Sequence, residues 1–174
     1  MKRTLLVSVL LMGFFTFRTQ ANPLSVGSAA PDIVASNQDA KAVNLADIYA
    51  RGLTLVYFYP KADTPGCTLE SCSLRDSMVD LKAKNLTILG VSEDSPAAQK
   101  KFKDKYQLPF ELIADNDGKV AAAFGVPVTL GLASRQSFII RDGKVVWSSL
   151  SVKPKEHTKE VQNALDKLRE SGSN

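Results

Sequence analysis

The chain has 174 residues, with 22 Lys and Arg against 18 Asp and Glu, 44% apolar residues, two cysteines and one histidine. This is the composition of an ordinary globular domain, which excludes wholesale disorder and collagen-like repeats. Two cysteines cannot form a scaffold of several disulfides, and together with one histidine they fall short of the four ligands of a Cys/His zinc site.

Residues 1–21 have the pattern of a secretory signal peptide. Residues 4–17 form an uncharged stretch rich in Leu, Val, Met and Phe, and Thr19 and Ala21 place small residues at positions −3 and −1 of a cleavage site. The stretch is shorter than the roughly 20 residues that span a bilayer, which argues against a retained membrane anchor. We therefore predict cleavage after Ala21, export to the periplasm and no stable membrane association afterwards.

Cleavage would also change the charge of the protein. It removes Lys2, Arg3 and Arg18 and no acidic residue, so the formal net charge falls from +4 to +1. A nearly neutral domain lacks the excess of positive charge that binds the phosphate backbone of nucleic acid, so nucleic acid is not an expected partner.

Residues 22–174 show no repeat and no linker, so we predict one domain. Asp32–Ala35 and Ala42–Leu45 flank a polar turn and predict an N-terminal hairpin. Leu53–Tyr59 is apolar almost throughout, which is typical of a strand buried on both faces, and Pro60 ends it.

The pattern then predicts a helix over Pro65–Lys84, a second buried strand over Leu86–Ser92 and an amphipathic helix over Ser95–Tyr106. The later expected elements are a short strand at Phe110–Ala114, helical turns at Val120–Phe124, hairpin strands at Gln136–Ile140 and Lys144–Ser148, and a last helix over Pro154–Glu170. Strands that alternate with helices in this way predict an α/β fold with a central mixed sheet flanked by helices.

The segment between the first buried strand and the next helix carries the strongest chemical signal. Thr64 fits the N-cap and Pro65 the first helical position, which places Cys67 in the first turn. Free backbone N–H groups and the positive end of the helix dipole favour the thiolate, the reactive form of cysteine. The alternative interpretation is a small apolar residue buried where the strand meets the helix.

Cys72 follows Cys67 by five residues. On a continuous helix that spacing separates the two α-carbons by about 9 Å, beyond the range of about 4.4–6.8 Å that a disulfide permits. Either the two residues never bond, or the helix unwinds when they do. A redox pair that switches between these two states is the sharper hypothesis, and a static structural disulfide fits poorly.

These residues resemble the active-site segment of the peroxiredoxins, in particular the bacterioferritin comigratory protein or peroxiredoxin Q subgroup. The resemblance rests on Phe58-Tyr59-Pro60-Lys61, Thr64-Pro65-Gly66-Cys67-Thr68, Glu70 and Cys72. Further matches are Ala30-Pro31-Asp32, Leu89-Gly90-Val91-Ser92, and Arg135 together with Ser137-Phe138-Ile139-Ile140. The similarity covers residues 26–165.

The resemblance implies a thioredoxin-like fold and reduction of hydrogen peroxide or organic hydroperoxides without metal, flavin or haem. Cys67 would be the peroxidatic nucleophile and Cys72 the resolving cysteine. Arg135 would stabilise thiolate and oxygen charge, Thr64 would offer its hydroxyl, and Pro60 would shield the thiolate.

The partner implied is thioredoxin or, for an exported protein, a thioredoxin-like dithiol beyond the membrane. Many members of the subgroup are monomers, and we expect the same here.

Several residues allow a second interpretation or depart from the family pattern. Gln99 stands where many members of the subgroup have His, and Ser137 stands where Thr is common. Arg135 could instead be a salt-bridged surface arginine on an edge strand, and Glu70 either orders the helix start or lies on a solvated face. His157, in a polar stretch, is expected to be solvated.

Two rival functions remain on the same fold. One is an exported thiol-disulfide oxidoreductase or redox-regulated chaperone, which would show disulfide reductase activity without peroxidase activity. The other is a binding module, which an unreactive Cys67 would reveal.

Overall fold

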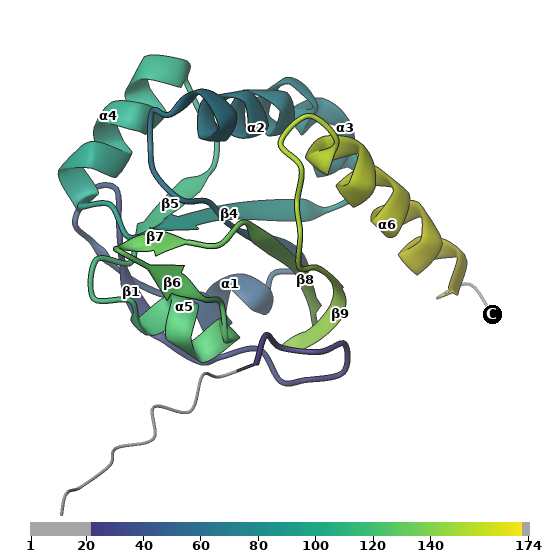
Figure 1. Ribbon diagram of the computed structural model, residues 1–174. Coiled ribbons are helices and arrows are strands. Elements are labelled where there is room, and N and C mark those ends of the chain that lie inside the picture. Colours follow the sequence, from purple (N-terminus) through teal and green to yellow (C-terminus); the bar gives the residue numbers. More distant parts are fainter. Residues whose placement is uncertain (1–21, 172–174) are drawn as a thin grey trace, which may run out of the picture.

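The computed structural model describes residues 22–171 and shows one mixed sheet between two layers of helices (Figure 1). Within these residues the sheet has seven strands in the order β2-β1-β5-β4-β3-β8-β9. The strands are β1 Val34–Asn37, β2 Ala42–Asn44, β3 Leu53–Phe58, β4 Leu86–Ser92, β5 Glu111–Ala114, β8 Gln136–Arg141 and β9 Lys144–Ser149. The helices are α1 Leu45–Tyr49, α2 Pro65–Asp76, α3 Met78–Ala83, α4 Pro96–Tyr106, α5 Lys119–Phe124 and α6 His157–Ser171.

The strand directions confirm the predicted mixed sheet. β3, β4 and β5 run parallel, whereas β8 pairs antiparallel with β3 and with β9. β1 and β2 form the expected N-terminal hairpin at the far edge of the sheet. β3 therefore lies between β4 and β8, with both faces of its chain covered, which explains its nearly continuous apolar sequence.

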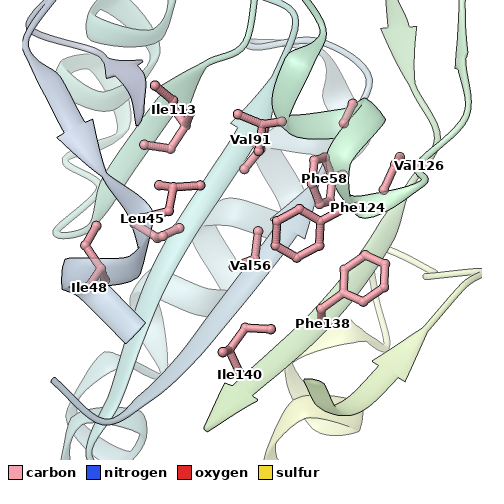
Figure 2. Close-up of a cluster of buried hydrophobic side chains, with 14 of the residues drawn as sticks. Leu45, Ile48, Val56, Phe58, Val91, Ile113, Phe124, Val126, Phe138 and Ile140 are labelled. Carbon is pink, nitrogen blue, oxygen red and sulfur yellow. The ribbon is translucent and has the colours of Figure 1, made fainter. Parts of the chain in front are cut away.

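Each face of the sheet has its own hydrophobic core. On one face α1 and α5 pack against the sheet, and the rings of Phe58, Phe124 and Phe138 meet there with centroids 5.2–6.1 Å apart (Figure 2). On the other face α2, α3, α4 and α6 cover Leu55 and Tyr57. The second core includes Cys67, so this thiol belongs to the packed interior of this face.

The structure corrects the predicted elements in two places. The helix expected over Pro65–Lys84 is two helices, because the backbone at Ser77 leaves the helical region (φ −93°, ψ 8°). The last helix begins at His157, three residues later than predicted, and a turn occupies 154–156.

Two short elements escaped the sequence patterns. α1 has only five residues, too few for a periodicity to show, although Asn44 caps it by accepting a hydrogen bond from the Ala46 amide. The small hairpin β6 Val128–Thr129 and β7 Leu132–Ala133 turns at Leu130 and Gly131, both with positive φ. Leucine rarely adopts that conformation, so of the two turn residues only Gly131 is a turn signal in the sequence.

The predicted signal peptide lies outside the described residues. Within residues 22–171, none of the helices combines the length and the apolar character needed to cross a bilayer.

Truncation of Phe138 should measure the contribution of the aromatic core. We expect Phe138→Ala to lower the free energy of unfolding by about 3–5 kcal/mol, because the fully buried ring leaves a cavity between Phe58 and Phe124. Val79→Ala is the control, since Val79 is 82% exposed and its truncation should change stability by less than about 0.5 kcal/mol. Urea denaturation of both variants checks this, and equal losses would contradict the assignment of the core.

Candidate active site

The connection between β3 and α2 places Cys67 in the interior at the start of a helix. Thr64 occupies the N-cap with an extended backbone (φ −89°, ψ 153°), and Pro65 is the first helical residue, as predicted. Cys67 is the third residue of α2 and is buried. Its thiol therefore lies in the first helical turn, where the backbone amides favour a negative charge.

Contacts from two other elements hold the loop that precedes α2. The Ala62 amide donates to Asp94 Oδ2 at 2.7 Å, just beyond the end of β4. Asp63, whose φ is +59°, accepts hydrogen bonds from Lys105 Nζ at 2.8 Å and from the Tyr106 hydroxyl at 2.7 Å, both at the end of α4. The loop conformation therefore depends on segments more than 30 residues away.

Gln99 of α4 connects the end of β3, from which this loop starts, to the neighbouring strands β4 and β5. The Tyr59 hydroxyl donates to Gln99 Oε1, and Gln99 Nε2 donates to Ser92 Oγ at 2.8 Å and to the Ile113 carbonyl at 3.0 Å. Ser92 in turn donates to Asp94 Oδ2 at 2.7 Å. Gln99 is fully buried, so it links the sheet, α4 and Asp94.

Arg135 contacts the cysteine from the segment just before β8, the strand that pairs with β3. Its Nη2 donates to Cys67 Sγ at 3.4 Å and its Nη1 donates to the Glu70 carboxylate. Arg135 directly precedes β8, which lies between β3 and β9, and its side chain is only 16% exposed. The alternative of a surface arginine on an edge strand is therefore wrong.

The electrostatic surroundings keep Arg135 charged. Burial of the guanidinium opposes its charged form, but Glu70 and Cys67 outweigh this effect and raise the pKa of Arg135 above its ordinary value. A permanent positive charge with fixed donors therefore faces the Cys67 sulfur.

Glu70 and His157 are both fully buried, which excludes one of the two interpretations of Glu70 and corrects the expectation that His157 is solvated. Glu70 does not lie on a solvated face, because Arg135 binds its carboxylate. His157 is not solvated, because α6 begins at this residue and packs its first turn against α2. His157 Nδ1 lies 2.9 Å from Glu70 Oε1, and Nε2 shares a hydrogen bond of 2.9 Å with Ser137 Oγ on β8.

The other predicted residues lie on or beside the same segment. Pro60 is half-buried and follows directly on Tyr59. The Thr64 hydroxyl donates to the Lys61 carbonyl at 2.9 Å instead of capping the helix. Cys72 is a half-buried free thiol on the same uninterrupted helix as Cys67, so the structure is that of the dithiol state.

Sequence reasoning missed the part played by His157 and Ser137. Their contacts join the first turn of α6 to β8 through tertiary packing, for which local polarity gives no signal. Glu70 carried a usable signal: three residues after Cys67, it lies on the same face of α2 as the cysteine.

Comparison with known proteins agrees with this arrangement. The model of the AhpC/TSA family matches residues 26–148. Peroxiredoxin Bcp of Escherichia coli is 40% identical over 152 residues, covering 83% of this chain and 97% of that protein. Peroxiredoxin Q from the chloroplast of Oryza sativa is 37% identical over 155 residues, covering 87% and 71% of the two chains.

Solved structures show the same relationship. Peroxidoxin BcpB of Mycobacterium tuberculosis superposes with a TM-score of 0.76 at 31% identity, over 81% of this chain and 96% of that one. The bacterioferritin comigratory protein of Xanthomonas campestris, described for its alkyl peroxide reduction activity, gives a TM-score of 0.74 at 30% identity, over 82% and 96%. The chain therefore belongs to the AhpC/TSA family and is a thiol-dependent peroxidase of the Bcp and Q type of peroxiredoxin.

Proposed function

We propose that this peroxidase uses Cys67 as the attacking thiolate and Cys72 as the resolving thiol. The observation that carries the proposal is the placement of the buried Cys67 Sγ at the first turn of α2, 3.4 Å from Arg135 Nη2. A fixed cation and a helix N-terminus at one sulfur stabilise the thiolate, and the same donors can stabilise an oxygen that gains charge beside it.

In the first step the Cys67 thiolate attacks one peroxide oxygen. An S–O bond forms, the O–O bond breaks, and the leaving oxygen takes up a proton to become water or an alcohol. The sulfur is oxidised by two electrons to a sulfenic acid and the peroxide is reduced. Hydrogen peroxide and organic hydroperoxides both fit this step, and the Xanthomonas relative described with alkyl peroxides supports the second class.

Arg135, Thr64 and Pro60 complete the proposed site. Arg135 aims one nitrogen at the sulfur while Glu70 holds the other, so that its donors are oriented before peroxide arrives. The Thr64 hydroxyl donates its hydrogen bond to the Lys61 carbonyl, which leaves the hydroxyl oxygen free to accept a hydrogen bond from a peroxide. The half-buried Pro60 borders the segment and offers no N–H group.

In the second step Cys72 attacks the sulfenic sulfur. An S–S bond forms, the S–OH bond breaks, and the hydroxyl leaves as water. Since α2 is continuous from Pro65 to Asp76, this step requires its first turns to unwind. A thioredoxin-like dithiol then reduces the disulfide and is itself oxidised.

Residues 1–21 support export of the protein, and the proposed reductant is therefore a thioredoxin-like dithiol protein in the periplasm. The charged start, the apolar stretch and the small residues before Asn22 support this proposal. We propose that the exported protein acts as a monomer.

Replacement of each cysteine should separate the two steps. We expect Cys67→Ser to abolish hydroperoxide consumption, because the remaining thiol, Cys72, lies at the eighth residue of α2, beyond the first helical turn. Cys72→Ser should consume about one equivalent of peroxide per chain without external thiol, leaving a Cys67 sulfenic acid that dimedone traps. Peroxide assays with hydrogen peroxide and cumene hydroperoxide, followed by mass spectrometry, check both results. Full activity of Cys67→Ser, or reduction of insulin disulfides without peroxidase activity, would contradict the proposal.

Removal of the Arg135 guanidinium should slow the first step. We expect Arg135→Ala to lower the rate constant for peroxide attack by about 10²–10³, as for other lost charge-stabilising donors. The readout is single-turnover oxidation of Cys67 in stopped flow. Arg141→Ala is the matched control, because Arg141 lies at the opposite end of β8 and should leave this rate unchanged. An unchanged rate in Arg135→Ala would refute its assigned role.

Export can be tested independently of catalysis. Cell fractionation should find the full-length gene product in the periplasm with an N-terminus at Asn22, and a form without residues 1–21 should stay in the cytoplasm. N-terminal sequencing of the periplasmic protein checks the cleavage site. Recovery of the full chain only from the cytoplasm would remove the basis for a periplasmic reductant.

A further inference from the structure

His157 belongs to a buried polar chain that ends at the reactive sulfur. Ser137 Oγ contacts His157 Nε2, His157 Nδ1 faces Glu70 Oε1, Glu70 binds Arg135, and Arg135 Nη2 donates to Cys67 Sγ. His157 and Glu70 have no exposed surface, so solvent cannot replace either partner of their contact.

The two oxygens of Glu70 have different partners. One accepts a hydrogen bond from Arg135, whereas Oε1 lies 2.9 Å from His157 Nδ1, and among the described residues neither of these two buried atoms has another hydrogen-bond partner. Two bare lone pairs facing each other in the interior are unfavourable, and a hydrogen bond between these two atoms would satisfy both. His157 is therefore the polar group that faces the second oxygen of Glu70.

Glu70 also lies between Cys67 and Cys72 in the chain. The segment that must unwind for the disulfide to form therefore includes Glu70, and unwinding withdraws its carboxylate from Arg135 and His157. The contact with His157 belongs to the helical thiol state and opposes the step that follows it.

We propose that His157 is a positioning residue that acts through Glu70 and has opposite effects on the two chemical steps. It holds Glu70, so that Arg135 is aimed at Cys67 and peroxide attack is fast. The same contact keeps α2 wound, so that Cys72 reaches the sulfenic acid more slowly. This inference rests on the proposed roles of Cys67 and Cys72.

A slower resolving step has a chemical consequence. The longer the sulfenic acid persists, the more of it a second peroxide can oxidise to sulfinic acid. In that reaction a second S–O bond forms, the O–O bond of the peroxide breaks, and water or an alcohol is released. His157 thereby sets how much sulfinic acid forms at a given excess of peroxide.

Four variants test the inference. His157→Leu removes both polar contacts, His157→Asn keeps an amide N–H near the position of Nδ1, and His157→Gln keeps an amide near Nε2, toward Ser137. Thr158→Val is the matched control, because the Thr158 hydroxyl joins α6 to Ser73 of α2 at 2.8 Å, outside the segment from Cys67 to Cys72. Circular dichroism and thermal melts establish that each variant is folded.

Three quantities are measured in each variant. The first is the rate constant for peroxide attack, in a Cys72→Ser background. The second is the rate constant for disulfide formation after one equivalent of peroxide, with both cysteines present. The third is the sulfinic acid fraction at excess peroxide, from mass spectrometry.

We expect His157→Leu and His157→Gln to slow attack by about tenfold or more, to speed disulfide formation several-fold and to lower the sulfinic fraction. His157→Asn should stay close to the parent protein, and Thr158→Val should change neither rate by more than about twofold. If His157→Leu does not fold, the Asn and Gln variants still decide the question. Two rates that fall together, or rates that do not respond, would overturn the inference. Failure of the proposed function would instead show in the parent protein, where Cys67 would not be oxidised.

Discussion

The buried carboxylate of Glu70 is the constraint on which the site depends. A carboxylate without solvent access must be paired, and its partners Arg135 and His157 come from the segment before β8 and from the first residue of α6. One side chain of α2 therefore fixes three elements relative to one another. Because Arg135 is held by one nitrogen, its other nitrogen is left aimed at the Cys67 sulfur.

In the proposed mechanism, the same helix must satisfy two conflicting requirements. Attack needs α2 wound, so that Cys67 stays at the helix N-terminus beside Arg135, whereas the disulfide needs the residues between the cysteines to leave the helix. The Tyr57 hydroxyl shares a hydrogen bond of 2.9 Å with Ser71, within that segment, and burial keeps Tyr57 neutral by raising its pKa. Ser73 and Thr158 join α2 to α6 just beyond the segment. The contact of Ser71 therefore restrains the segment that opens, whereas the contact of Ser73 with Thr158 anchors the second half of α2.

The sheet supplies the rigid support for this arrangement. β3 is paired on both sides and buried on both faces, so the loop after it starts from a fixed point. The loop is then held by Asp94 and by the contacts of Asp63 with Lys105 and Tyr106. A thiol can be kept in a reactive position by such a scaffold even though its own helix must move.

The sequence alone determined the α/β class, the mixed sheet, the terminal hairpin and the position of Cys67 at a helix start. These follow from local signals: the continuous apolar strand before Pro60, the turn at Asp142-Gly143, and Thr64-Pro65 at the helix start. The spacing of Cys67 and Cys72 also showed, from helix geometry alone, that a disulfide requires unwinding.

Only the tertiary structure decided which polar side chains join the thiol. Arg135 could have been a surface residue, and His157 lies in a polar stretch that local reasoning placed in solvent. His157 is fully buried and Arg135 is largely covered because β8 pairs with β3 and α6 packs on α2, contacts between residues 65 to 90 positions apart. Burial and pairing at such separations depend on how the layers pack, and a local pattern of charge or periodicity carries no record of that packing.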